Sequence, residues 1–392
     1  MKRTANILWL PGWYPSKTDF LAGDFTDRHA KATSKNVNVT VLFVTKDPAL
    51  ASNASCIEVE RVEGLTIYRG YYNCSASLGY FSKLISVRLH FKLLFRLYRS
   101  AKKEQGRFEL LHVHISLRQG LLAQWLKWKH KIPYVITEQS SWFMPVGDKI
   151  YPRSLALQKI ISSNIQNADA LHVVSNSLGN ALKQKFHFIK NFTVIPNVVD
   201  TNIFYPVLQK AITAQLNFFT VTSDVYHKNT DGILRAFAIY LKAGHSAVLD
   251  VAGPNFEPLV PLAGQLGISK SVNFLGALPY HLVAQKMQSA AALIFFTRYE
   301  TFGCVMAEAL CCGTPVIATK IPVLEENLEE HHNALFVEPE NEADLALKME
   351  EFTLGKYQFN KEAIARQAAA RYGYNKAGDA FLDFYKTVLP GL

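Results

Sequence analysis

Two glutamates eight residues apart, Glu300 and Glu308, are the side chains of this sequence best placed to do chemistry. Glu300 follows a strand-like run that ends near Phe296, and Glu308 lies in a helix pattern that Gly313 ends. A helical rise of about 1.5 Å per residue separates them by about 12 Å, whereas glycosidase carboxyls lie about 5–9.5 Å apart. The spacing therefore disfavours hydrolysis. This spacing favours two carboxylates that bind the two ends of one extended ligand. One carboxylate could bind hydroxyls of a sugar and the other hydroxyls of a ribose.

The loop between these glutamates offers a second binding element. A helix is expected to begin near Phe302, which leaves the amides of Gly303 and Cys304 free at its N-terminus. Such amides favour a phosphate or a sugar hydroxyl, and Gly303 lets a ligand approach the backbone closely. The alternative is that Glu308 is a solvated helix residue and Glu300 an ordinary loop charge.

The elements that must position these residues follow from short apolar runs that alternate with helix-like segments. Buried parallel strands of α/β proteins have this pattern. The runs lie at 7–10, 39–44, 110–113, 134–136, 170–174, 193–195, 218–221, 248–251, 272–274, 293–296 and 316–318. Eleven strands are too many for one doubly wound sheet, so we predict two domains, 1–205 and 206–374. The helical stretch 375–392 could pack on either domain, and we expect it to join the first. Ligands bind at the carboxyl ends of such strands, so we expect a site in a cleft between the domains.

The stretch from Leu293 to Ala318 resembles the signature of the family-four retaining glycosyltransferases, through Glu-Thr-Phe-Gly, Ala-Glu-Ala-Leu and Gly-Thr-Pro-Val. That family has the GT-B fold, in which two Rossmann-like domains face one another, the first binding the acceptor and the second the nucleotide sugar. The resemblance assigns the donor sugar to Glu300 and to the backbone of Phe302, Gly303 and Cys304, and the nucleotide ribose to Glu308.

Other positions resemble the same family. Lys228 matches its diphosphate-binding lysine, whereas Ser223 stands where a second, basic contact is common. Gly23 would face the diphosphate from the loop after the first strand. Gly276 ends a segment that usually lies near the nucleotide base. Gln139 stands where relatives commonly carry a His beside the reacting sugar carbon, and because a glutamine cannot exchange a proton as a histidine can, its catalytic assignment departs from the family pattern.

No metal site is expected. The five cysteines show no Cys-x-x-Cys spacing, which disfavours zinc and a disulfide framework and fits a reducing cytoplasm. His112 and His114 lie on one expected strand, where we expect them to face opposite sides and to pack rather than bind metal. The resemblance implies no cofactor beyond the nucleotide sugar as co-substrate, since protein cations and helix dipoles usually replace the metal ion there.

The chain carries 42 Lys+Arg against 32 Asp+Glu, a formal net charge of +10. Residues 81–107 place cations at steps of three and four beside a bulky apolar face. This pattern predicts a basic amphipathic helix that contacts an anionic membrane surface, the alternative being an ordinary solvated helix face. No apolar run approaches the about 20 residues of a membrane span. Nothing beyond charge favours nucleic acid, so we expect none as a partner.

The cysteine pattern favours a cytoplasmic protein, and the resemblance implies an enzyme at the inner face of the cytoplasmic membrane. As the resemblance implies, it would move a sugar from a UDP- or GDP-sugar to a hydroxyl acceptor with retention of configuration. The acceptor would be a lipid-linked or polysaccharide glycan, in polysaccharide, lipopolysaccharide or capsule assembly. Two alternatives stay open. One is a GT-B scaffold with impaired catalysis that serves as a binding or regulatory subunit, and the other is a sugar-nucleotide epimerase, which needs no acceptor.

Overall fold

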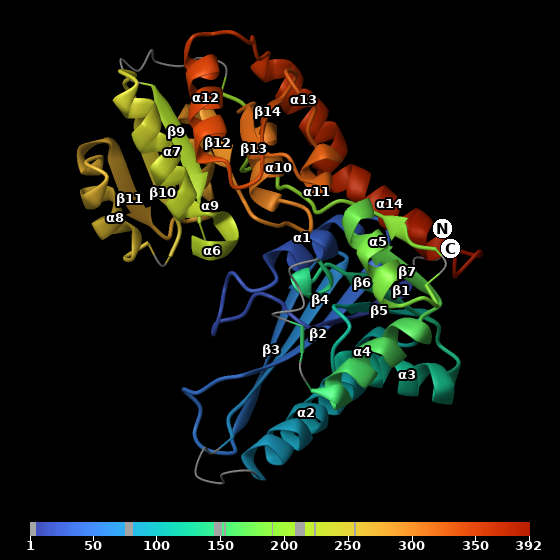
Figure 1. Cartoon of the computed structure of the whole chain (residues 1–392). Coiled ribbons are helices and arrows are strands. Elements are labelled where there is room, and N and C mark those ends of the chain that lie inside the picture. The colour runs from blue at the N-terminus through green and yellow to red at the C-terminus, as the bar shows by residue number, and fades with distance from the viewer. Residues whose placement is uncertain are drawn as a thin grey trace. The chain divides into compact units, whose positions relative to one another are not determined.

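The computed structural model describes residues 5–74, 81–144, 151–152, 154–189, 191–207, 216–222, 225–254 and 256–392. The chain divides into two compact units, each with its own sheet (Figure 1). The first comprises Met1–Val174, Leu178–Val198 and Tyr374–Leu392, and the second comprises Ser175–Ser177 and Val199–Gly373. Ser223 lies outside the described residues.

The main chain enters the second unit at Val199 rather than near residue 205. The reason is local packing. The amide of Val199 donates to the carbonyl of Tyr372 at 2.9 Å, and the buried ring of Phe204 lies edge-on to Tyr280 at 6.2 Å. The segment that we expected to link two domains is thus already part of the second one.

The first unit contains an eight-stranded sheet in the order β3-β4-β2-β1-β5-β6-β7-β8. Its strands are β1 (Asn6–Pro11), β2 (Asn38–Lys46), β3 (Ser55–Val62), β4 (Leu65–Tyr72), β5 (Leu110–His114), β6 (Tyr134–Glu138), β7 (Ala170–Val173) and β8 (Thr193–Val194). All neighbours pair in parallel except β3 with β4. The antiparallel β3–β4 pair was not predicted, because β3 is an edge strand whose side chains are mostly exposed and therefore lacks an apolar run.

The helices of this unit are α1 (Asp24–Thr33), α2 (Phe81–Gln105), α3 (Gln119–His130), α4 (Leu155–Gln166), α5 (Asn176–Lys185) and α14 (Tyr374–Lys386), with a short 3₁₀ turn η2 at Ser141–Phe143. The C-terminal helix α14 packs against α1. Their backbones approach closely, since a Cβ at Gly378 would lie 2.5 Å from the carbonyl oxygen of Ala32. Residues 374–392 are accordingly part of the first unit.

The second unit contains a six-stranded, all-parallel sheet in the order β11-β10-β9-β12-β13-β14. Its strands are β9 (Asn217–Val221), β10 (Val248–Ala252), β11 (Val272–Gly276), β12 (Ala292–Phe295), β13 (Val316–Thr319) and β14 (Ala334–Val337). Its helices are α6 (Val225–Lys228), α7 (Thr230–Lys242), α8 (Leu259–Gln265), α9 (Tyr280–Ser289), α10 (Cys304–Cys311), α11 (Pro322–Glu325), α12 (Glu342–Thr353) and α13 (Lys361–Tyr372), with a 3₁₀ turn η4 at Ser269–Ser271. The predicted α/β class with two mainly parallel sheets is confirmed.

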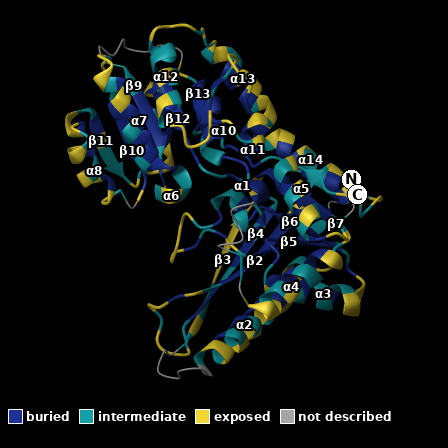
Figure 2. Cartoon of the chain, viewed as in Figure 1, coloured by how far each residue is buried: buried dark blue, intermediate teal, exposed yellow. Residues whose placement is uncertain are grey.

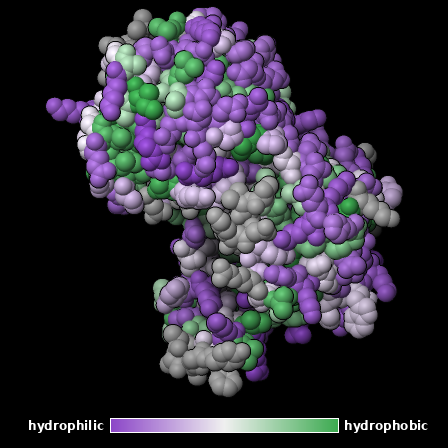
Figure 3. All heavy atoms as spheres, viewed as in Figure 1, coloured by the Kyte–Doolittle hydropathy of each residue, from purple (hydrophilic) through white to green (hydrophobic). Residues whose placement is uncertain are grey.

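Burial follows the sheets. The strands near the middle of each unit are buried, and exposed residues gather on the outer sides of the helices (Figure 2). The visible surface is mostly hydrophilic, with small apolar areas scattered over it (Figure 3). Among the helices that the structure describes, none has the length and apolar character to cross a membrane.

Candidate functional site

Lys228 and Glu300 form a mostly buried ion pair in the second unit. Lys228 ends α6, which follows β9, and Glu300 lies in the loop that follows β12. The ammonium pairs with the Oε1 atom of Glu300, and the two side chains are 13% and 8% exposed. Burial acts to raise the pKa of Glu300, but Lys228 and His227 outweigh it and hold this pKa at about 2. Glu300 is therefore a charged carboxylate in a shielded place, not an ordinary loop charge.

The loop that carries Glu300 is fixed against α6. The ring of His227 stacks on Tyr299 with centroids 4.0 Å apart, and its Nε2 atom donates to the carbonyl of Tyr299 at 2.6 Å. The hydroxyl of Thr297 and the amide of Arg298 both donate to the carbonyl of His227 at 3.0 Å. These contacts join residues far apart in sequence and set the position of Glu300 before any ligand binds.

The helix after this loop begins two residues later than the sequence pattern indicated. Gly303 is the N-cap, with φ +93°, and α10 starts at Cys304 rather than near Phe302. A residue with a Cβ is strained at this φ, which explains the glycine. Phe302 lies before the helix, buried and edge-on to Tyr372 at 5.7 Å. The backbone of Gly303 and Cys304 still forms the N-terminal end of α10, as expected.

Glu308 lies on the inner side of α10. It is 3% exposed, so it is not the solvated helix residue of the alternative interpretation. Gly276 ends β11 with φ +67°, and its carbonyl accepts the amide of Gly253 at 2.7 Å. Beside it, Phe256 and Phe274 stack with centroids 5.6 Å apart. Lys228, Glu300 and Gly276 thus all lie at or after the carboxyl ends of strands in one sheet, where α/β proteins bind ligands.

Two predicted site residues belong to the first unit. Gly23 caps α1 with φ +74°, and a Cβ there would lie 2.4 Å from the carbonyl group of Trp13. The contact with Trp13 alone requires glycine at this position. Gln139 follows β6 and is 7% exposed, and its Nε2 atom has no hydrogen-bond partner among the residues that the structure describes.

The carboxylate beside Gln139 was not among the predicted site residues. Glu138 is buried at the carboxyl end of β6 and accepts three backbone amides at 3.0–3.1 Å, those of Ser116, Gln139 and Ser140. Burial raises the pKa of Glu138 to about 7, although the three amides lower it in part. The available signal was a glutamate that ends an apolar strand run. Its partners could not be predicted, because one of them, Ser116, follows the neighbouring strand β5.

The expectation that His112 and His114 face opposite sides of the sheet was wrong. Their ring centroids are 4.0 Å apart, on the same side of the sheet, because residues two apart on a strand share a face. With His29 and His172 they form a buried cluster beneath α14. No group of three or more His, Cys, Asp or Glu in the described part of the chain is arranged to hold a metal ion.

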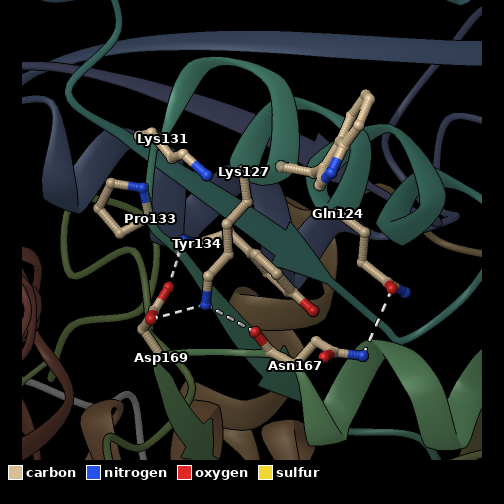
Figure 4. A pocket seen from close by; sticks show the side chains of 8 residues that line it. Gln124, Lys127, Lys131, Pro133, Tyr134, Asn167 and Asp169 are labelled. Atoms are coloured by element: carbon tan, nitrogen blue, oxygen red, sulfur yellow. Dashed lines mark hydrogen bonds and ion pairs between the residues drawn. The ribbon is translucent and has the colours of Figure 1, made fainter.

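A pocket of about 510 Å³ lies in the first unit at the amino ends of strands β6 and β7 (Figure 4). Its lining residues are Gln124, Lys127, Trp128, Lys131, Pro133, Tyr134, Asn167 and Asp169. Two of its charged groups are engaged with one another, since Lys127 pairs with Asp169 at 2.7 Å, and Asp169 also accepts the amide of Tyr134 at 2.9 Å. It is remote along β6 from Glu138 and Gln139, and it matches none of the predicted site residues.

The two units together have the GT-B glycosyltransferase fold. The structure is similar to that of sucrose-phosphate synthase from Thermosynechococcus elongatus, with a TM-score of 0.77, 15% sequence identity and coverage of 99% of this chain and 100% of that one. It is also similar to Anabaena HepE in complex with UDP and glucose, with a TM-score of 0.68, 15% identity and coverage of 98% and 100%.

Family models agree with the fold. Residues 26–203 match Glycosyltransferase Family 4, and residues 210–375 match Glycosyl transferases group 1. This chain belongs to the family-four glycosyltransferases. A D-inositol 3-phosphate glycosyltransferase from Streptomyces bingchenggensis is 30% identical over 34% of this chain and 30% of its own length. N-acetyl-alpha-D-glucosaminyl L-malate synthase from Bacillus anthracis is 22% identical over 58% and 60%. The chain thus spans less than two thirds of either relative.

Proposed function

We propose that this protein transfers a sugar from a UDP- or GDP-sugar to a hydroxyl acceptor, with retention of configuration. The observation that carries the proposal is the shielded Lys228–Glu300 pair at the carboxyl ends of β9 and β12, close in sequence to the start of α10. Membership of a glycosyltransferase family and the likeness to HepE, which was solved with UDP and with UDP-glucose, support a nucleotide sugar as donor.

In this proposal each residue of the second unit has one role. Glu300 accepts hydrogen bonds from hydroxyls of the donor sugar, and with a pKa near 2 it stays ionised and does not act as an acid. Lys228 and the amides of Gly303 and Cys304 stabilise the diphosphate as its charge grows. These groups supply the positive charge, so the proposal needs no metal ion. Glu308 accepts hydrogen bonds from the ribose, and Gly276 lies beside the base.

The proposed reaction balances without a further reactant. The bond between the anomeric carbon and the diphosphate oxygen breaks, and a bond to the acceptor oxygen forms on the same face of the sugar. The acceptor proton passes to the departing phosphate oxygen, which releases a nucleoside diphosphate. Gln139, which cannot take up a proton, would then serve only as a hydrogen-bonding group.

We further propose that the acceptor is a lipid-linked or polysaccharide glycan and that α2 contacts an anionic membrane surface. The helix supports this idea because its cations are all exposed, namely Lys83, Arg88, Lys92, Arg96, Arg99, Lys102 and Lys103. A helix that inserts into a membrane needs an exposed apolar face, whereas the apolar side of α2 packs against the protein. Leu93, Leu94 and Leu97 are buried within the protein, whereas Leu84 is well exposed. Contact through α2 would therefore be electrostatic.

Calorimetric titration with UDP, GDP and their common sugar conjugates tests the proposal. We expect one nucleotide series to bind and the binding to be lost in Glu308→Ala and weakened in Glu308→Gln. Glu362→Ala, an exposed glutamate of α13, is the matched control and should bind as the wild type does. Failure of every nucleotide to bind would contradict a donor site. Product analysis then separates the alternatives, because an epimerase converts the donor alone and an impaired scaffold binds it without turnover.

A further inference from the structure

Two tryptophans from different loops contact each other at the carboxyl ends of the strands of the first sheet. Trp13 follows β1, and Trp142 lies in η2, just after β6. Their ring centroids are 6.2 Å apart at an interplanar angle of 77°. Strand β5 lies between β1 and β6 in the sheet, so the pair bridges across the end of β5. Trp13 nevertheless keeps 36% of its surface exposed.

The exposure of Trp13 does not come from a loose loop. The amide of Gly12 donates to the carbonyl of His114 at 2.8 Å. Tyr14 is fully buried, and its hydroxyl donates to Asp27 at 2.7 Å. The Nε atom of Arg69 donates to the carbonyl of Pro15 at 2.9 Å. With the residues on both sides fixed in this way, the Trp13 ring is held in a preformed position that reaches solvent.

A polar group without a partner lies on the same loop as Trp142. Gln139 is more than nine-tenths buried, yet its Nε2 atom donates to no described residue. Its backbone is fixed, since Glu138 accepts the amides of Gln139 and Ser140, and the Ser140 hydroxyl accepts the amide of Trp142 at 3.2 Å. A buried donor of this kind costs free energy unless an acceptor reaches it.

Two aromatic rings together with an amide donor on the loop that carries one of them fit one class of ligand well. The C–H-lined face of a neutral sugar ring packs on an aromatic ring, and its hydroxyls accept hydrogen bonds from an amide. We infer that Trp13, Trp142 and Gln139 form a subsite for a neutral sugar ring of the acceptor. This inference rests on the proposed function, to which it adds a neutral sugar ring as the part of the acceptor that is bound and the residues that bind it.

Saturation-transfer NMR with a panel of methyl glycosides, namely those of glucose, galactose, mannose and N-acetylglucosamine, tests the subsite on the full chain. At least one glycoside should show transfer to its ring C–H protons. Trp13→Ala and Trp142→Ala should weaken its binding by about tenfold, Gln139→Leu by up to about tenfold, and Trp13→Phe should retain most of it. Trp128→Ala is the matched control, because Trp128 is 73% exposed on α3, outside the subsite. Unfolding curves of each variant establish that it folds.

The inference is overturned if no glycoside binds, or if Trp13→Ala and Trp142→Ala bind as well as the wild type. Its failure is distinguishable from failure of the proposed function, since the nucleotide titration depends on residues of the second unit. Nucleotide binding without an effect of the tryptophans leaves the transferase proposal in place and removes the subsite. Glycoside binding without nucleotide binding would leave the sugar subsite in place and remove the transferase proposal.

Discussion

At the scale of single residues, the state of Glu300 depends on Lys228. Burial acts to raise the pKa of Glu300, and the Lys228 ammonium is the largest of the influences that hold it near 2, with His227 beside it. Because the folded-state pKa is below the ordinary value of 4.5, the ionised carboxylate stabilises the folded protein above pH 4.5. That contribution is lost as the pH falls towards 2. The pair is therefore structural as well as part of the proposed donor site.

We predict that Lys228→Met lowers the free energy of unfolding by about 3–5 kcal/mol at pH 7, because it leaves a buried carboxylate without its counter-ion. The double variant Lys228→Met/Glu300→Gln should recover much of this loss, since no uncompensated charge remains. Urea unfolding of the wild type, both single variants and the double variant measures the coupling. A double variant that loses as much as the sum of the singles would show that the two side chains act independently.

Some residues of the candidate site could be predicted from the sequence, whereas their contacts could not. Glu300, Gly303 and Glu308 stand in one local strand-loop-helix pattern, so their candidacy followed from spacing. The pairing of Glu300 with Lys228 spans 72 residues and depends on how β9 and β12 neighbour each other in the sheet. The state of Glu138 likewise depends on Ser116 of an adjacent strand end. Contacts of this kind require the tertiary fold and are not encoded in any local pattern.

At the scale of elements, a directed chain of hydrogen bonds crosses the first sheet. His172 Nε2 donates to the carbonyl of Ile195 at 2.8 Å, since a carbonyl only accepts. Burial keeps His172 neutral by lowering its pKa to about 4, so its Nδ1 accepts from the Thr137 hydroxyl at 2.7 Å. That hydroxyl oxygen must then accept from His112 Nε2 at 2.6 Å. Each group fixes the tautomer of the next.

The chain ends on the C-terminal helix. His112 Nδ1 must accept from the Tyr385 hydroxyl at 2.7 Å, and the Tyr385 oxygen accepts from Trp9 Nε1 at 3.1 Å. Trp9, His112 and Tyr385, which make these two hydrogen bonds, are all buried. The hydroxyl of Tyr385 therefore ties α14 to the strands β1 and β5, which explains how the last helix of the chain is held on the first unit.

We predict that Tyr385→Phe destabilises the protein by about 1–3 kcal/mol for each of the two groups left unpaired, Trp9 Nε1 and His112 Nδ1. The aromatic packing stays, so the loss reports the hydroxyl alone. Tyr205→Phe, on a tyrosine that is 49% exposed, is the matched control and should change stability little. Guanidinium unfolding measures both. Equal stability of the two variants would mean that the hydroxyl contributes nothing to holding α14.

Buried histidines also predict how this unit responds to acid. Burial lowers the pKa of five of them, namely His29, His90, His112, His114 and His172. Since these pKa values are lower in the folded state, the unfolded chain binds more protons below about pH 6.5. Glu138, whose pKa is raised to about 7, acts in the opposite direction with one proton. Five against one leaves up to four net protons, each worth about 1.4 kcal/mol per pH unit.

The thermal midpoint should therefore fall steeply from pH 7 to pH 5. Differential scanning calorimetry across this interval checks the sign. A midpoint that stays constant or rises would contradict the neutral, buried state of the histidine cluster. Glu138→Gln should make the fall steeper between pH 5 and pH 7, because it removes the opposing contribution of this carboxyl.

Strands and helices were predictable to different degrees. The eleven predicted runs became strands because buried parallel strands carry continuous apolar sequence, which is a local signal. The β3–β4 pair and β14 were missed. An edge strand such as β3 exposes most of its side chains and therefore carries no continuous apolar run. The start of α10 was displaced because Gly303 takes a cap conformation that hydrophobic periodicity does not report.

At the scale of the whole molecule, the two-domain α/β organisation was predictable because two sets of strands exceed what one sheet holds. The position at which the chain passes from one unit to the other was harder to predict. Val199 and Phe204 belong to the second unit through contacts that a linker-like composition does not reveal. The side on which the last helix packs was ambiguous from its amphipathic pattern alone. It was settled by contacts such as Gly378 with Ala32 and Tyr385 with Trp9.

The distribution of the net charge of +10 gives the last prediction. If the exposed cations of α2 contact an anionic membrane, the full chain should bind vesicles of phosphatidylglycerol and phosphatidylcholine but not of phosphatidylcholine alone. Binding should weaken with salt, because the Debye length is about 8 Å at 0.15 M. Vesicle sedimentation measures it.

A fourfold variant of α2 locates that contact, with changes of Arg88, Lys92, Arg96 and Arg99 to Gln. At about 1 kcal/mol for each cation near the surface, it should bind about a thousandfold more weakly than the wild type. The matched control removes four exposed cations elsewhere, with changes of Lys270, Lys320, Arg366 and Lys376 to Gln. Because both variants have the same net charge, a loss confined to the α2 variant reports the location of the cations. An equal loss in both would mean that total charge, not the face of α2, governs association, and salt-independent binding would contradict an electrostatic contact.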